Sequence, residues 1–162
     1  MDDFNVADKN VNDVYKDIGK IAKKLVDEKS KAIDDLIKTL SNVESLSDEE
    51  IRKYMLKISL ESYSFGEIKE HSIMKQDCAV ALMKETQANI FNSETGTAEV
   101  RRNKSITDSN AQITVNILYN SIANLMKTKL DEAHRVVNTL NSILISRAAA
   151  AKLNQSSNVF DD

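Results

Sequence analysis

The stretch Leu46-Ser47-Asp48-Glu49-Glu50-Ile51 decides the fold, because it carries the strongest helix-start signal in the chain. The Ser47 hydroxyl can accept a hydrogen bond from the backbone N–H three residues later, and the Glu50 carboxylate can reach back to the N–H of Ser47. Acidic residues also favour the positive N-terminal end of a helix. The pattern therefore predicts that a second long helix begins at Ser47, separate from a first helix before it.

The rest of the chain lacks the residues that interrupt helices. Its 162 residues include no proline and only three glycines, so nothing forces a kink, and β-architectures built on Gly/Pro-rich turns are disfavoured. Apolar residues recur at helical spacing of three or four positions in three tracts, which cover residues 11–43, 47–91 and 108–152. The sequence thus predicts an all-α protein with three long helices.

These helices divide the chain into three predicted regions. Residues 1–46 form an acidic N-terminal helix, and residues 47–152 form a core in which helices two and three pack as an antiparallel hairpin with a basic loop at residues 92–105. Residues 153–162 are polar and predict a disordered acidic tail. The first helix either packs on the hairpin or extends from it. Because the apolar stripes are narrow, we expect assembly into an oligomeric helical bundle, coiled coil or ring.

Cysteine and hydropathy patterns bear on the compartment. A single cysteine excludes a disulfide framework and fits a reducing environment. Cys78 lies in an apolar run, so we expect its thiol to be buried. No run of apolar residues is long enough for a transmembrane span, and the polar, acidic N-terminus is unlike a secretory signal. The sequence predicts a cytoplasmic protein without membrane contact.

Enzymatic motifs are absent from the sequence. The two histidines, His71 and His134, are far apart and have no partner at metal-ligand spacing. The chain contains neither a zinc-protease motif nor a glycine-rich phosphate loop. We therefore predict no enzymatic activity, no catalytic residues, no metal site and no cofactor.

The charge is uneven along the chain, although the net charge is only −3. Residues 1–50 hold 8 basic and 13 acidic residues, whereas residues 101–152 hold 8 basic and 3 acidic residues. A basic segment in an acidic protein suggests an anionic partner or an acidic neighbouring subunit, and the alternative is an ordinary solvated surface. The candidate phosphate-binding residues are Arg101, Arg102 and Lys104 beside the third helix, Lys84 near the end of the second, and Lys127 and Lys129 further along the third.

Two basic residues fall at apolar seam positions of the third helix. We expect Lys129 and Arg147 to extend from the edge of an interface towards water. Aromatic residues suited to base stacking are few, and Phe91 and Tyr119 are expected to be core residues.

The order of elements in residues 50–150 resembles that of a known protein family, and the resemblance implies a function. The order of elements along the chain resembles that of the UvsY-type recombination mediators of tailed phages. These elements are the segment Tyr63–Lys69, the helix Met74–Phe91, the polar glycine-containing loop, the basic stretch Arg101–Lys104 and the long terminal helix. The resemblance covers roughly residues 50–150 and rests on the order of elements. It implies an all-helical, ring-forming protein that binds single-stranded DNA and helps to load a recombinase onto strands coated with single-strand-binding protein, in the host cytoplasm. In that family a Lys/Arg motif precedes the loop, but here only Lys84 is basic in that stretch.

Two functions are therefore predicted. The first is an oligomeric single-stranded-DNA-binding mediator of phage recombination or replication, with itself and a recombinase or single-strand-binding protein as partners. The second is a structural or adaptor helical protein, a virion component or a host-protein binder, without a nucleic-acid role. The sequence does not separate DNA, RNA and an acidic protein as the partner of the basic segment.

Overall fold

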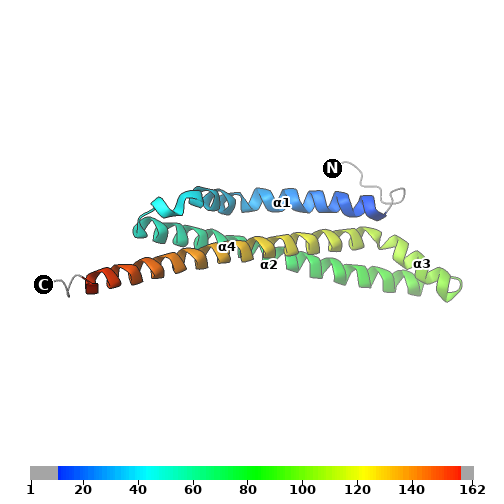
Figure 1. Cartoon of the computed structure of the whole chain (residues 1–162). Coiled ribbons are helices and arrows are strands. Elements are labelled where there is room, and N and C mark those ends of the chain that lie inside the picture. The colour runs from blue at the N-terminus through cyan, green and yellow to red at the C-terminus, as the bar shows by residue number, and fades with distance from the viewer. Residues whose placement is uncertain (1–10, 158–162) are drawn as a thin grey trace. The chain divides into compact units, whose positions relative to one another are not determined.

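The computed structural model describes residues 11–157, which form four α-helices and a short 3-10 helix (Figure 1). These elements are α1 (Val11–Thr39), η1 (Leu40–Ser45), α2 (Asp48–Ser93), α3 (Ala98–Asp108) and α4 (Asn110–Ser157). The described residues contain no strand, so the predicted all-α class is confirmed. Among the same residues, no helix is both long and apolar enough to cross a membrane.

The helix start predicted at Ser47 is confirmed. The N–H of Ser47 donates to Glu50 Oε2 at 2.8 Å, and the N–H of Glu50 donates to Ser47 Oγ at 3.3 Å. The Ser47 hydroxyl also donates to Glu50 Oε2 at 2.7 Å. The two hydrogen bonds that Glu50 Oε2 accepts, from the Ser47 hydroxyl and from the Ser47 N–H, stabilise the carboxylate and lower the pKa of Glu50 below its ordinary value. Local side-chain chemistry therefore fixes the first turn of α2.

Two predicted irregular segments are wrong. The basic stretch of the loop predicted at residues 92–105 is helical, because Thr97 caps α3 by accepting a hydrogen bond from the N–H of Val100 at 3.4 Å. The connection between α2 and α3 is only residues 94–97, where Gly96 adopts a positive φ of 118° that other residues rarely take. The tail predicted to be disordered from residue 153 is helical to Ser157, and residues 158–162 lie outside the described residues.

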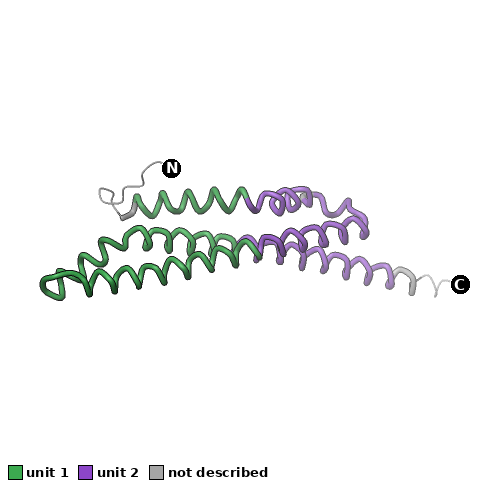
Figure 2. The backbone as a smooth tube through the Cα atoms, turned by 180° about the vertical axis from the view of Figure 1, so that it is seen from behind, with its two compact units in different colours: residues 1–28, 67–127 green, residues 29–66, 128–162 purple. Residues whose placement is uncertain are grey.

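The chain divides into two compact units, shown in green and purple in Figure 2. Unit 1 comprises residues 1–28 and 67–127, and unit 2 comprises residues 29–66 and 128–162. Helices α1, α2 and α4 each contribute to both units, whereas α3 belongs to unit 1.

Unit 2 has an apolar core with a seven-residue repeat. In α2 the buried residues Ile51, Ile58 and Phe65 follow one another at that spacing, and in α4 the buried pair Ala133 and Leu140 has the same spacing. A seven-residue repeat keeps one seam of a helix facing its neighbours, as in coiled coils. Ile33 of α1 is also fully buried in this unit.

The interior of unit 1 contains both apolar and polar side chains. Its buried apolar residues include Ile18 and Ala22 of α1 and Met126 of α4. Ser105 and Ser109, where α3 meets α4, are buried as well. Ser109 accepts a hydrogen bond from Gln87 of α2, so hydrogen bonds as well as hydrophobic burial hold this unit together.

Candidate nucleic-acid interface

The structure distributes the six predicted phosphate-binding residues over three helices. Lys84 lies on α2, and the α3 residues are Arg101, Arg102 and Lys104. Lys127 and Lys129 lie on α4. The first five belong to unit 1, but Lys129 belongs to unit 2 and is described separately.

Several contacts hold α3 and the start of α4 against the C-terminal part of α2. The guanidinium of Arg101 lies 4.7 Å from the centroid of the Phe91 ring. Gln87 Nε2 donates to Ser109 Oγ at 2.9 Å. Lys75 and Tyr119 form a second cation–aromatic contact at 5.5 Å. Arg101 and its neighbours are thus carried by a short helix that is fixed at several points.

The side chain of Arg101 on α3 is held against the Phe91 ring. It is half-buried, and its Nε has no hydrogen-bond partner among the described residues. A cation over an aromatic face is attracted by the ring quadrupole, by about 0.5–2 kcal/mol depending on solvation. The sequence predicted a core position for Phe91 and not this contact. The signal that indicates it is an aromatic residue and an arginine on either side of a short connection.

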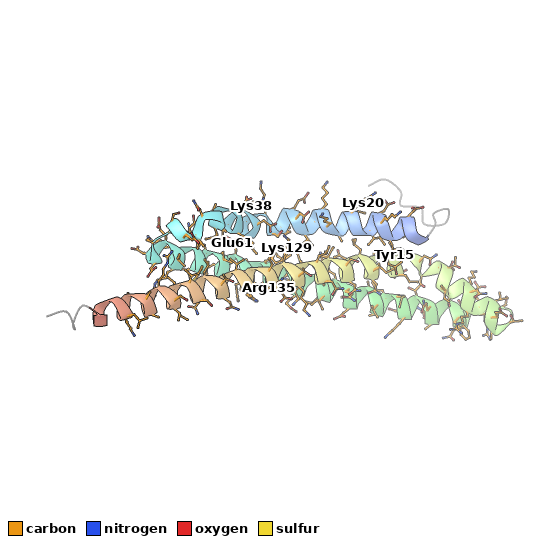
Figure 3. The ribbon with its side chains drawn as sticks, viewed as in Figure 1. Tyr15, Lys20, Lys38, Glu61, Lys129 and Arg135 are labelled. Carbon is orange, nitrogen blue, oxygen red and sulfur yellow. The ribbon has the colours of Figure 1, made fainter. Side chains whose placement is uncertain are left out.

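Two of the predicted cations are paired with acidic residues. Lys104 forms an ion pair with Glu94, which raises the pKa of the lysine. Lys129 lies on α4 (Figure 3). Its Nζ lies 2.8 Å from Asp34 Oδ1, and this pair joins α4 to α1 within unit 2. Asp34 likewise raises the pKa of Lys129. Because both charges are neutralised locally, these lysines are weaker phosphate ligands than the sequence predicted.

Three predicted cations are exposed. The side chains of Lys84, Arg102 and Lys127 make no ion pair with any other residue in the range 11–157. Arg102 directly follows Arg101 on α3 and is exposed, whereas Arg101 is half-buried over Phe91. We call these three residues the Arg–Phe cluster.

Other predicted features have mixed outcomes. The thiol of Cys78 is exposed, so the prediction of a buried cysteine is wrong. Arg147 does not simply extend into water, because it donates hydrogen bonds to several backbone carbonyls. Within residues 11–157, no group of three or more His, Cys, Asp or Glu side chains is placed to hold a metal ion. Comparison with protein-family models, characterised proteins and solved structures finds no match to this chain.

Proposed function

We propose that this protein is an oligomeric single-stranded-nucleic-acid-binding protein that contacts phosphates through the Arg–Phe cluster. The observation that carries the proposal is the position of Arg101 over Phe91, 4.7 Å from the ring centroid, beside the exposed Arg102. An arginine held by an aromatic ring loses less freedom when it binds phosphate, and aromatic rings also offer stacking surfaces to bases. Lys84 and Lys127 add exposed positive charge in the same unit.

The proposed role is non-catalytic and rests on repetition of a small site. Each chain offers few uncommitted cations, so a monomer is expected to bind weakly and with little sequence preference. We propose that α2 and α4 pair as an antiparallel hairpin and that several copies assemble into a bundle or ring, which multiplies the phosphate contacts along one strand. This arrangement suits a recombination mediator that acts beside a recombinase or a single-strand-binding protein.

Titration of labelled oligo-dT, followed by fluorescence anisotropy, tests the proposal. We expect binding that weakens steeply from low to high salt and falls by about tenfold in the Arg101→Ala/Arg102→Ala double variant. The matched control is Arg52→Ala/Lys53→Ala, which removes the same charge from exposed positions in unit 2. Binding that is absent, insensitive to salt or equal in the two double variants would contradict the proposal. A parallel titration with oligo-U separates DNA from RNA.

A second candidate function is a structural or adaptor role. It is favoured by an exposed apolar stripe on α2 in unit 2, where Leu56, Leu60 and Tyr63 are 61%, 60% and 71% exposed. Their spacing of four and three residues places them on one helix face, and such faces mark protein-binding surfaces. Stable association with a partner protein that is lost in Leu60→Glu, in a protein without affinity for oligonucleotides, would favour this function.

A further inference from the structure

Helix α3 is attached to the rest of unit 1 without burying an apolar side chain of its own. Of its 11 residues, Ser105 is buried and Arg101 is half-buried, and the other nine are exposed. The exposed residues include Val100 and Ile106, at 55% and 43%. Helices α1, α2 and α4 each bury apolar residues in this unit. Segments with few buried apolar contacts open more readily than the rest of a fold.

Polar contacts hold α3 against α2. One is the contact within the Arg–Phe cluster, where the guanidinium lies 4.7 Å from the ring centroid. Another is the ion pair between Lys104 and Glu94. A further contact is the hydrogen bond that Gln87 Nε2 donates to Ser109 Oγ, at 2.9 Å. Exposed ion pairs and single hydrogen bonds each contribute little stability, so a small energetic change is enough to release α3 from α2.

Helices α3 and α4 meet at a bend (Figure 1), and Ser109 is the one residue between them. Its φ and ψ are −96° and 7°, and ψ differs from that of a regular helix by roughly 50°. The Ser109 hydroxyl donates to the carbonyl of Ile106 at 3.0 Å and accepts the hydrogen bond from Gln87. The N–H of Ile113 already donates to the Ser109 carbonyl at 3.1 Å, as in a continuous helix. A rotation at this one residue would therefore join α3 to α4.

The connection at the other end of α3 permits this movement. Residues 94–97 link α2 to α3, and Gly96 among them has a φ of 118°. Glycine gives the connection a wide choice of backbone dihedral angles. Four extended residues span at most about 13–14 Å, so α3 has room to leave α2 while the helix α2 stays in place.

We propose that Ser109 is a hinge between two forms of unit 1. In the bent form, which the structure shows, α3 lies against α2. In the straight form, α3 continues α4 as one helix and has left α2. The two forms differ in available positive charge, because the bent form pairs Lys104 with Glu94 and half-buries Arg101, whereas the straight form frees both cations. The hinge operates without a ligand, so this inference does not rest on the proposed nucleic-acid function.

Distances between spin labels in the full chain, measured by double electron–electron resonance, test the inference. The labels are attached at Asn89→Cys of α2 and Asn103→Cys of α3, which are exposed positions, and Cys78→Ser removes the one native thiol. We expect a short distance from the bent form and a smaller population at a longer distance from the straight form. Adding Ser109→Ala should raise the ratio of straight to bent form about three- to tenfold, because the hydroxyl bonds are lost and alanine favours a helix.

Further variants leave the hinge residue unchanged. Gln87→Ala removes the donor to Ser109, and Glu94→Gln removes the charge that pairs with Lys104. Both should raise the ratio in the same direction. Glu85→Gln, at an exposed position of α2, is the control for Glu94→Gln and should leave the ratio unchanged.

Ser121→Ala is the matched control for Ser109→Ala. The Ser121 hydroxyl donates to the carbonyl of Ile117 within α4, so its loss should not change the ratio of the two forms. A second pair of labels, at Asn103→Cys and Asn120→Cys, spans the hinge. This pair should keep a narrow distribution around a distance of about 25 Å, because a helix rises 1.5 Å per residue.

Three outcomes would overturn the inference. The first is a single short distance between positions 89 and 103 in every variant. The second is a ratio that Ser109→Ala changes no more than Ser121→Ala does. The third is a broad distribution between positions 103 and 120, which would show that α3 unfolds and does not join α4. Circular dichroism establishes that each variant is folded before its distances are interpreted.

Discussion

Arg147 of α4 donates from Nη1 to the backbone carbonyl of Leu46 at 2.7 Å. Its Nη2 donates to the carbonyls of Val43 and Glu44 at 3.3 and 3.2 Å, and Nη1 also lies 3.1 Å from Asp48 Oδ1. Carbonyls at the end of a helix have no partner within it. The Arg147 guanidinium thus donates hydrogen bonds to backbone carbonyls at the end of η1 and links the connection before α2 to α4. All of these residues belong to unit 2.

We expect Arg147→Ala to lower the free energy of unfolding by about 1–3 kcal/mol, because several partly buried acceptors lose their charged donor. Urea unfolding followed by circular dichroism measures the change. Arg135→Ala is the matched control, since Arg135 is an exposed arginine of the same helix (Figure 3) whose Nε bonds only within α4. Arg147→Lys should restore only part of the loss, because an ammonium cannot reproduce the forked geometry. Full stability in Arg147→Lys would contradict this account.

The N-cap of α2 gives a second prediction. Ser47→Ala should destabilise the protein by about 1 kcal/mol, because the N–H of Glu50 loses its acceptor. Ser64→Ala, at an exposed position inside α2, should be neutral or slightly stabilising, since alanine is the better helix former. Thermal unfolding of the two variants side by side makes the comparison. Equal losses in both would show that the Ser47 cap contributes nothing specific.

The same cap predicts a pH dependence. Hydrogen bonds from Ser47 lower the pKa of Glu50 in the folded protein below its ordinary value of 4.5. A lowered folded-state pKa means that the stabilisation is present above that ordinary value and is lost as the pH falls through the folded-state pKa. The stability difference between the wild type and Glu50→Gln should therefore be present at neutral pH and shrink below pH 4.5. A difference that is constant down to strongly acidic pH would contradict it.

Local features were predictable from the sequence, and contacts between helices were not. Ser47 and Glu50 lie three residues apart, so the start of α2 depends only on their own chemistry. The pairing of Lys129 with Asp34 depends on which faces of α1 and α4 meet, and a single helical stripe does not determine that. Cys78 illustrates the same limit, because an apolar run identifies a helix but not which of its residues a neighbouring helix covers.

The ion pair between Lys129 and Asp34 yields a further prediction. Both side chains are about a quarter exposed, so a double-mutant cycle with Lys129→Met and Asp34→Asn should give a coupling of about 0.5–1 kcal/mol. Asp34 raises the pKa of Lys129 above its ordinary value of 10.5. The stabilisation is therefore complete below pH 10.5 and is lost as the pH rises through the raised folded-state pKa. Coupling near zero in urea unfolding at neutral pH would show that the pair contributes no stability.

Variants at Phe91 and Arg102 distinguish two contributions to oligonucleotide binding, the positioning of Arg101 by the ring and the positive charge itself. Phe91→Ala removes the ring under the guanidinium but no charge, so affinity for oligo-dT should fall severalfold while the dependence on salt stays the same. Arg102→Ala removes one exposed cation, so its plot of log affinity against log salt should become less steep by about one unit or less. Phe91→Tyr keeps a ring at this position and should bind as the wild type does. If Phe91→Ala instead changes the salt slope as Arg102→Ala does, the ring acts by holding α3 in place, and the stacking contact has no separate role in binding.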